Sequence, residues 1–409
     1  MSQVLSMDTG RPAKRYCFVV PRFGLGVGAG AETLMREIAL RLAKRGEEVH
    51  VLTTCAKDNR TWENSLPEDV TNEDGITVYR YKVDERNLNV WVPYQVNISE
   101  GINPGVEAQL DWLTHSVNST GLYEHIKNNA DSFDALFFGP YLFGTTFWGS
   151  LIRPDKSILI PCLHDENYAY LETLSSMFRL VKGCVFNANA EMEFANNLYG
   201  HIKGGEVGMG FEPLDKDYVA NLKPYLDLNL KYILYVGRKE MGKNAHKLID
   251  NFVAAKNSGR IDENLKLVFV GPGSFDDLMR PQALKRSDIV DIGFLSEADK
   301  HGLIKHALSV VQPSRNESFS IVLMEAWLLG VPVIVDSGCA VTREHVLESN
   351  GGLYYDSNDE FGEVVRYLEH DPNLCKALGS NGYEYVLNKY SWKAVLNRFD
   401  TVMESLLEG

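Results

Sequence analysis

The chain has 409 residues, 44% of them hydrophobic, and a formal net charge of −14. This length is too great for one compact α/β core and predicts two domains of roughly 200 residues each. The acidic balance argues against a nucleic-acid-binding protein, in which a basic face is expected. The six cysteines occur singly, without a CxxC pair or a histidine at metal-ligand spacing, so we expect reduced thiols and no metal site. An apolar signal segment is lacking, and no apolar run reaches about 18 residues, which predicts a cytoplasmic protein.

The first half of the chain alternates strand and helix patterns. An apolar strand over Tyr16–Pro21 leads through a glycine-rich turn into an amphipathic helix over Thr33–Lys44, which stops at Gly46 before a strand over Val49–Thr53. This order is typical of a βαβ unit. Further strands are expected at Ile76–Tyr81, Ala135–Phe138, Ser157–Pro161 and Gly183–Asn187.

Two segments interrupt the alternation. Asn87–Trp112 is aromatic and lacks a clear period, so we expect an irregular insertion; whether it binds an acceptor or covers the core stays open. Val207–Lys223 loses periodicity while its charge rises, which indicates a linker.

The second half resumes the alternation with KYILYVGRK, which begins at Lys231. A helix is expected over Ala245–Asn257, and strands at Leu265–Val270, Ile289–Ile292, Leu308–Gln312 and Val331–Val335. The two halves together predict two doubly wound domains that face each other across a cleft.

The turn after the first strand carries Gly24, Gly26, Gly28 and Gly30, a spacing that invites comparison with a dinucleotide-binding fingerprint. That fingerprint needs an acidic residue at the end of the second strand, whereas this strand ends in VLTTC, so NAD binding is not expected. Two interpretations remain. The turn is either a flexible connection or a loop whose backbone, at Gly28 and Gly30, closes over a phosphate or an acceptor.

The segment QPSRNESFSIVLMEAWLLGVPVIV contains two carboxylates, Glu317 and Glu325, in an otherwise apolar run. Carboxylates in such a run need partners. Ser318 and Ser320 offer N-caps for a helix over Ile321–Leu329, and the loop before it presents backbone N–H groups that can bind an anion. One glutamate precedes that helix terminus and the other lies within the helix. Sugar, diphosphate and ribose follow one another in a nucleotide-sugar, which fits this layout.

Two cations follow the strand that ends at Val236. Arg238 comes directly after it and Lys243 five residues later, where they could clamp a diphosphate; the alternative is a solvated basic turn. Gly271, which begins a Gly-Pro-Gly turn after the next strand, would allow close approach of a ligand to the backbone.

Together these motifs resemble the retaining glycosyltransferases of the GT-B fold, specifically the GT4 family (glycosyl transferases group 1), over nearly the whole chain. The family's glutamates separated by seven residues are matched by Glu317 and Glu325, and its VGR…K signature by the segment from Val236 to Lys243. Further matches are the early turn AGAE with the helix after it, His164 after a central strand, Asn350-Gly351, and the terminal helix opened by Ser391-Trp392. The chain departs from the family at Ala29, which replaces a glycine, and at MGFE (209–212), which lacks the usual junction asparagine.

The resemblance implies an N-terminal acceptor domain over 1–212, a nucleotide-sugar domain over 213–388 and a C-terminal helix over 389–409 that packs back on the first domain. It further implies a metal-independent enzyme without a cofactor, whose donor is a nucleoside-diphosphate sugar, UDP before GDP. The acceptor would be a saccharide or a polyprenyl-linked saccharide in glycan or polysaccharide biosynthesis, so association with the inner face of the membrane stays open, as does the oligomeric state.

The roles implied for the site residues follow the parts of the donor. Glu325 would bind the ribose, and Arg238 with Lys243 the diphosphate. The backbone of Ser318, Phe319, Ser320 and Ile321 would hold the leaving phosphate and the sugar, while Gly271 and Phe294, the latter within Gly293-Phe294-Leu295, would lie near the base. Glu317 would contact sugar hydroxyls, and His164 would reach across the cleft to the sugar near the reacting carbon.

Several alternatives remain open. Glu317 could simply pair with Arg315, Glu325 with Arg238 or Lys243, and His164 could be a core histidine. Asp165 and Glu166 could orient its imidazole or be solvated. At the level of function, the alternatives are a GT-B epimerase or phosphorylase, or a partner subunit that keeps the fold without the activity.

Overall fold

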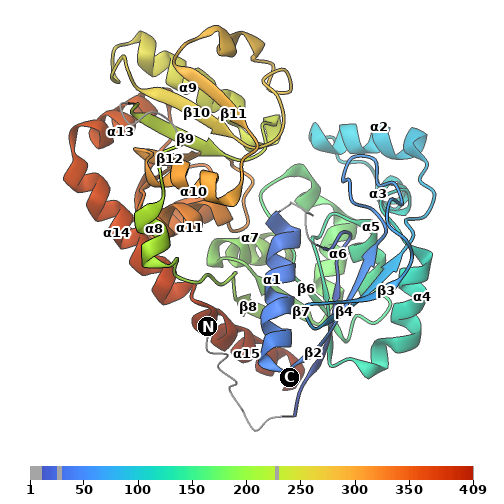
Figure 1. The fold of residues 1–409 in the computed structure, drawn as a ribbon. Helices are drawn as coiled ribbons and strands as arrows, with labels where there is room; N and C mark the ends of the chain where they lie inside the picture. The colour runs from blue at the N-terminus through green and yellow to red at the C-terminus, as the bar shows by residue number, and fades with distance from the viewer. Residues whose placement is uncertain (1–11, 25–29, 226–229, 409) are drawn as a thin grey trace. The chain divides into compact units, whose positions relative to one another are not determined.

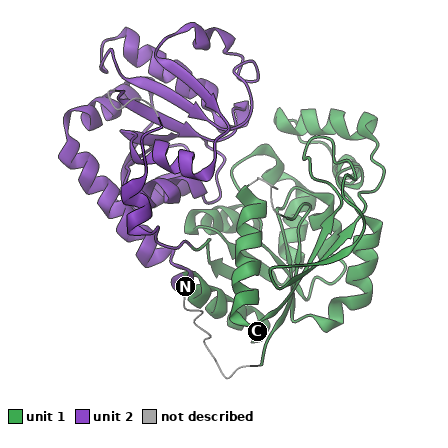
Figure 2. Ribbon diagram, in the orientation of Figure 1, with its two compact units in different colours: residues 1–210, 395–409 green, residues 211–394 purple. Residues whose placement is uncertain are grey.

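The computed structural model describes residues 12–24, 30–225 and 230–408, and its ribbon is drawn in Figure 1. The chain divides into two compact units, coloured separately in Figure 2. Unit 1 contains residues 1–210 and 395–409, and unit 2 contains residues 211–394. The boundaries expected from the sequence were 212/213 and 388/389.

Unit 1 is built on an eight-stranded sheet in the order β3-β4-β2-β1-β5-β6-β7-β8, parallel except for the antiparallel pair β3-β4. Its strands are β1 (Arg15–Val19), β2 (Glu48–Thr54), β3 (Val70–Glu73), β4 (Ile76–Tyr81), β5 (Ala135–Phe138), β6 (Ser157–Leu159), β7 (Gly183–Phe186) and β8 (Gly204–Glu206). The helices between them are α1 (Gly30–Arg45), α2 (Leu88–Ser99), α3 (Val106–Thr114), α4 (Thr120–Asn129), α5 (Gly144–Ser150), α6 (Glu172–Leu180) and α7 (Asn189–Tyr199).

Unit 2 is built on a six-stranded parallel sheet in the order β11-β10-β9-β12-β13-β14. Its strands are β9 (Tyr232–Val236), β10 (Lys266–Val270), β11 (Ile289–Gly293), β12 (Ser309–Gln312), β13 (Val333–Asp336) and β14 (Gly352–Tyr355). Its helices are α8 (Lys216–Asn221), α9 (Ala245–Asn257), α10 (Glu297–Lys305), α11 (Ile321–Leu328), α12 (Ala340–Ser349), α13 (Asn358–His370) and α14 (Pro372–Lys389). The strand order reverses between β9 and β12, and ligands of open α/β sheets bind at the carboxyl ends of the strands at such a point.

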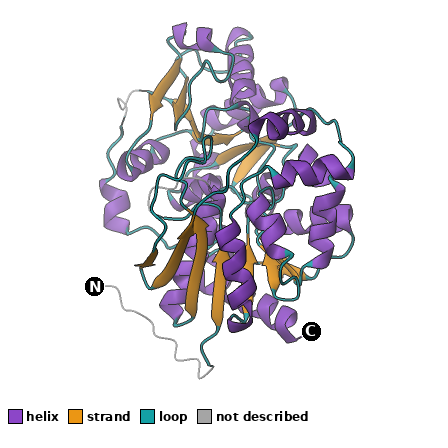
Figure 3. Ribbon diagram, turned by 90° about the vertical axis from the view of Figure 1, so that its right-hand side faces the viewer, coloured by secondary structure: helices purple, strands orange, loops and turns teal. Residues whose placement is uncertain are grey.

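Burial explains why the central strands are uninterrupted apolar runs. All five residues of β9, YILYV, are buried, because helices flank the strands of both sheets (Figure 3). Helix α1 instead buries one stripe that includes Leu34, Ile38 and Leu42, and it ends in Lys44 and Arg45, whose charges suit a helix C-terminus.

The last helix, α15 (Trp392–Glu408), begins in unit 2 and runs into unit 1, as expected for a GT-B chain. Within unit 1, Arg45 makes two hydrogen bonds to Asp400, of 2.8 and 2.9 Å. The Nη2 atom of Arg398 donates to the carbonyl of Val207 at 2.7 Å, and Phe399 packs edge-on against Tyr16. Charge pairing and aromatic packing therefore hold the end of the chain on unit 1.

The prediction of an irregular insertion over Asn87–Trp112 is wrong, because this segment forms α2 and most of α3. Asn87 begins α2 by accepting a hydrogen bond from the N–H of Asn89 at 3.2 Å. The helical period is hidden because Leu88, Val92 and Val96 stay exposed, so apolar residues occupy more than the buried face.

The segment expected to be a linker also contains a short helix, α8. Asp215 caps it by accepting a hydrogen bond from the N–H of Tyr218 at 2.8 Å. Among the helices that the structure describes, none is long and apolar enough to cross a membrane.

Candidate functional site

The carboxyl ends of β9 and β12 in unit 2 carry the charged residues that the sequence singles out. Lys243 lies in a 3₁₀ turn (Met241–Lys243) after β9, and Glu317 lies in the loop after β12. The Nζ atom of Lys243 is 2.7 Å from Oε1 of Glu317 and 3.4 Å from the carbonyl oxygen of Asn316. The pair is largely shielded, with the two side chains 26% and 12% exposed. The structure thus brings these two residues together across 74 positions of sequence.

The alternative ion pair between Glu317 and Arg315 is not the one found. The Nε atom of Arg315 bonds to Oδ1 of Asp336 at 3.0 Å, at the end of β13. The ion-pair partner of Glu317 is therefore Lys243.

Glu325, on α11, pairs with a residue that the sequence reasoning missed. Its Oε1 atom is 3.0 Å from Nζ of Lys300 on α10, and the same ammonium lies 3.0 Å from Glu297. Burial would lower the pKa of Lys300, but the two carboxylates outweigh it and raise that pKa above its ordinary value. The expected alternatives, Arg238 and Lys243, are not its partners. The sequence shows only that Glu297 and Lys300 are three residues apart, a spacing typical of an ion pair on a helix. It gives no sign of the pair with Glu325, which is 25 residues from Lys300.

The start of α11 differs from the expected capping by Ser318 or Ser320. Ser320 occupies the N-cap position, but its backbone is left-handed (φ +69°) and its hydroxyl makes no capping bond. That hydroxyl is buried and has no hydrogen-bond partner among the described residues. The first N–H groups of a helix lack acceptors within the helix, and together with a nearby ammonium they attract anions.

Phe319, next to Ser320, turns its ring into the core of unit 2. The ring stacks on Phe211 at 6.2 Å between centroids and meets Tyr390 and His345 edge-on. These aromatic contacts fix the loop that joins Glu317 to α11, while the neighbouring Ser318 and Ile321 remain only partly buried.

The remaining predicted residues of unit 2 lie after β9, β10 and β11. The Nη2 atom of Arg238 is 3.2 Å from Glu240, and its side chain is 46% exposed. Gly271 has φ +127°, and a Cβ there would lie 2.2 Å from the carbonyl oxygen of Gly237. Phe294 is 83% exposed, which is unusual for a large apolar side chain.

In unit 1, His164 follows β6. Its Nδ1 atom is 3.2 Å from Oε1 of Glu166, which also accepts a hydrogen bond of 2.6 Å from the hydroxyl of Tyr141. Of the two acidic residues that follow His164, Glu166 is therefore the one whose carboxylate lies close to the imidazole, whereas Asp165 accepts a hydrogen bond from the hydroxyl of Tyr170. Gly30 is the exposed first residue of α1, and Gly28 lies outside the described residues.

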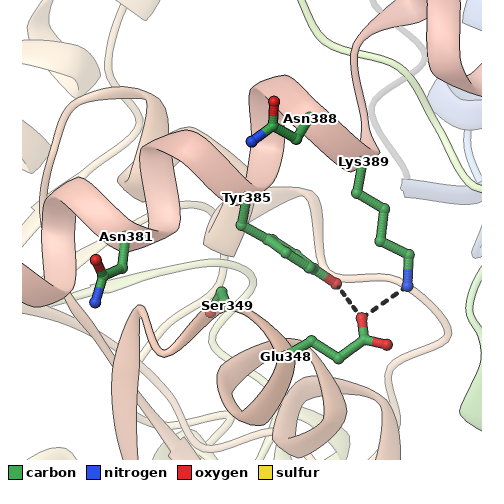
Figure 4. Close-up of a pocket in the computed structure, with 6 residues that line it drawn as sticks. All are labelled: Glu348, Ser349, Asn381, Tyr385, Asn388 and Lys389. Carbon is green, nitrogen blue, oxygen red and sulfur yellow. Dashed lines mark hydrogen bonds and ion pairs between the residues drawn. The ribbon is translucent and has the colours of Figure 1, made fainter.

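A separate polar pocket of unit 2 is lined by Glu348, Ser349, Asn381, Tyr385, Asn388 and Lys389 (Figure 4). The carboxylate of Glu348 accepts hydrogen bonds of 2.7 Å from both Tyr385 and Lys389, as the dashed lines show. None of the sequence-predicted site residues lines this pocket. Across the described residues, no group of three or more His, Cys, Asp or Glu side chains is arranged to hold a metal ion.

Comparison with known proteins identifies the family of the chain. Residues 223–385 match the family model described as glycosyl transferases group 1. An uncharacterized glycosyltransferase of Methanocaldococcus jannaschii is 30% identical over 388 residues, which cover 90% of this chain and 93% of that protein. The capsular polysaccharide biosynthesis glycosyltransferase CapM of Staphylococcus aureus is 26% identical over 50% of this chain and 54% of its own length.

Solved structures agree on the fold. Sucrose-phosphate synthase from Thermosynechococcus elongatus matches with a TM-score of 0.70 at 15% identity, covering 97% of this chain and 100% of that one. The Anabaena protein HepE in complex with UDP and glucose matches with a TM-score of 0.69 at 16% identity and the same coverage. The family model and the relative that is similar along nearly its full length show the family, and the solved structures show the architecture. The chain belongs to the glycosyl transferases group 1 and has the GT-B fold.

Proposed function

We propose that the chain is a retaining GT4 glycosyltransferase that moves a sugar from a nucleoside-diphosphate sugar, UDP before GDP, to a saccharide or a lipid-linked saccharide. The observation that carries this proposal is the Lys243–Glu317 pair directly ahead of the N-terminus of α11. It sets an ammonium and a carboxylate in contact four residues before Ile321, the first residue of the helix, and the first N–H groups of a helix have no acceptors within it. These are the groups that a sugar diphosphate requires.

Donor binding follows the order of the groups in unit 2. Arg238 and Lys243 would bind the diphosphate, and the backbone from Ser318 to Ile321 would bind the leaving phosphate. The carboxylate of Glu325, held by Lys300 at 3.0 Å, would accept hydrogen bonds from the ribose hydroxyls. The exposed ring of Phe294 offers a stacking surface for the base.

Transfer breaks the bond between the anomeric carbon and the diphosphate oxygen and forms a bond from that carbon to an acceptor hydroxyl oxygen. Negative charge develops on the leaving group, and its phosphate oxygen takes the proton of the acceptor hydroxyl. Lys243 and the N-terminus of α11 would stabilise that charge, and the proposal therefore needs no metal ion. Glu317 would orient the donor sugar through its hydroxyls, and His164 would contact the sugar near the reacting carbon. We assign no side chain as catalytic base.

The comparisons support the choice of donor and acceptor. HepE is described in complex with UDP and glucose, and CapM is described as a capsular polysaccharide glycosyltransferase. Both fit a UDP-sugar donor and a saccharide acceptor for this chain.

The test is to incubate the purified protein with UDP-glucose or GDP-mannose and a panel of saccharide acceptors, and to follow nucleoside-diphosphate release and the anomeric configuration of the product by NMR. Retention of configuration supports the mechanism, whereas inversion or the absence of any transfer contradicts it. Glu317→Gln should lose most of the turnover. Asp250→Asn, which removes the charge of a carboxylate paired with Arg280 at 2.7 Å, is the matched control and should keep it.

A further inference from the structure

A wholly buried lysine follows Arg238. The side chain of Lys239 is 0% exposed, and lysines are almost never fully buried unless they are paired. Its Nζ atom donates to the carbonyl oxygen of Gly271 and lies 3.0 Å from Oδ1 of Asp291. One ammonium group therefore bonds to both the loop after β10 and the end of β11.

The backbone around this lysine closes into the same small network. The N–H of Lys239 donates to the carbonyl of Pro272 at 2.8 Å. The N–H of Gly271 donates to the carbonyl of Gly293 at 2.8 Å, and the N–H of Gly293 donates to Oδ1 of Asp291 at 3.0 Å. We name Lys239, Gly271, Asp291 and Gly293 the Lys239 clasp. Its bonds join the carboxyl ends of β9, β10 and β11.

The clasp limits which groups remain for a ligand. The N–H and the carbonyl of Gly293 both bond inside the clasp. A base that binds after β11 would therefore contact Phe294 rather than the backbone of Gly293. The packing is also tight, since a Cβ at Gly273 would lie 2.7 Å from the carbonyl oxygen of Lys239. The loop after β10 therefore packs directly against the backbone of Lys239.

A gain in folding stability does not explain why a lysine is buried at this position. Burying an ammonium carries a desolvation cost that an apolar side chain of similar size avoids, and buried ion pairs are often replaceable without loss of stability. What the charge provides, and an apolar side chain does not, is a directed bond to one carbonyl and one carboxylate on two different loops.

We propose that Lys239 is a positioning residue for base selection: its ammonium sets the loops after β10 and β11, and these loops decide which nucleoside diphosphate is accepted. The inference rests on the proposed function, in which Phe294, directly after Gly293 of the clasp, offers a stacking surface for the base. Lys239 does not touch the ligand and acts through the clasp.

The test compares Lys239→Met with the wild-type protein in calorimetric titrations with UDP, GDP, ADP and inorganic diphosphate. The preference for the favoured nucleoside diphosphate over the other two should fall about tenfold, equivalent to about 1.4 kcal/mol. Affinity for inorganic diphosphate should change less, because the side chains of Arg238 and Lys243 bond to Glu240 and Glu317, which are not part of the clasp. Lys256→Met is the matched control: its ammonium also bonds two backbone carbonyls, those of Asp262 and Glu263, and its loss should leave the preference unchanged.

A second measurement separates positioning from general damage. Amide hydrogen exchange at Gly293 should become faster in Lys239→Met, while exchange within β14 stays as in the wild type. Should that variant not fold, Asp291→Asn removes the charge on the other side of the pair and should lower the same preference.

The outcomes are distinguishable. A wild-type protein that binds none of the three nucleoside diphosphates refutes the proposed function and the inference with it. A wild-type protein with a clear preference that Lys239→Met and Asp291→Asn both retain refutes the inference alone.

Discussion

Acid should destabilise unit 2 through a single buried imidazole. His345 is fully buried on α12, where its Nδ1 atom is 2.9 Å from the hydroxyl oxygen of Tyr385 and its ring meets Phe319 edge-on at 5.5 Å. Burial, with Lys389 acting in the same direction and Glu348 against it, lowers the pKa of His345 from 6.5 to about 3. The folded chain therefore keeps this ring neutral over most of the acid range.

The size of the effect follows from the two pKa values. Because the folded pKa is depressed, the unfolded chain binds a proton below about pH 6.5 that the folded chain does not bind until about pH 3. The contribution to stability is complete above pH 6.5 and is lost as the pH falls between these values. At about pH 5 the loss from this residue alone is about 2 kcal/mol.

Urea unfolding of the wild type and of His345→Gln, followed by tryptophan fluorescence at about pH 8 and about pH 5, measures this loss. Every other titrating group is common to both proteins, so the difference in their pH dependence isolates His345. Glutamine is uncharged at both pH values, and the variant should lose about 2 kcal/mol less than the wild type on acidification. An identical loss in both proteins would refute the reasoning.

Three further predictions concern the site. Glu325→Ala should weaken nucleotide affinity about tenfold in calorimetric titrations, because hydrogen bonds to a charged group are worth about 1.5–3 kcal/mol. Glu317→Ala should lower turnover more than nucleotide affinity, and equal loss of affinity in both variants would remove this division of roles. Gly271→Ala should lower the free energy of unfolding by about 1–3 kcal/mol, measured in urea, since its φ is +127° and the new Cβ would meet Gly237 at 2.2 Å. Gly242→Ala, where a Cβ meets nothing within 4 Å, is its control.

The sequence was a good guide to the sheets and to the two glutamates. Strands at Ile76–Tyr81 and Ala135–Phe138 have the predicted bounds. The first, ITVYRY, alternates buried and partly buried residues with the period of a strand, and the second, ALFF, is a continuous buried apolar run. Glu317 and Glu325 stood out because a carboxylate in an apolar run needs a partner, and the structure supplies an ammonium to each.

What the sequence could not give are contacts made between distant elements. Lys300 reaches Glu325 from another helix, and Lys239 reaches Asp291 across 52 positions, so no local pattern marks either lysine. The left-handed backbone of Ser320 is equally hidden, because serine at such a position usually reads as a capping residue. Helix α2 was missed for a different reason: its exposed apolar residues blur the period on which helix prediction depends.

Titration of UDP, GDP, ADP and NAD into the purified protein, first without added metal and then with EDTA, tests the central proposal most directly. We expect one nucleoside diphosphate to bind clearly better than the others, with no change in EDTA and with weaker binding in Glu325→Ala. Binding of NAD alone, binding that EDTA abolishes, or no binding of any nucleotide would contradict a metal-independent nucleotide-sugar site in unit 2.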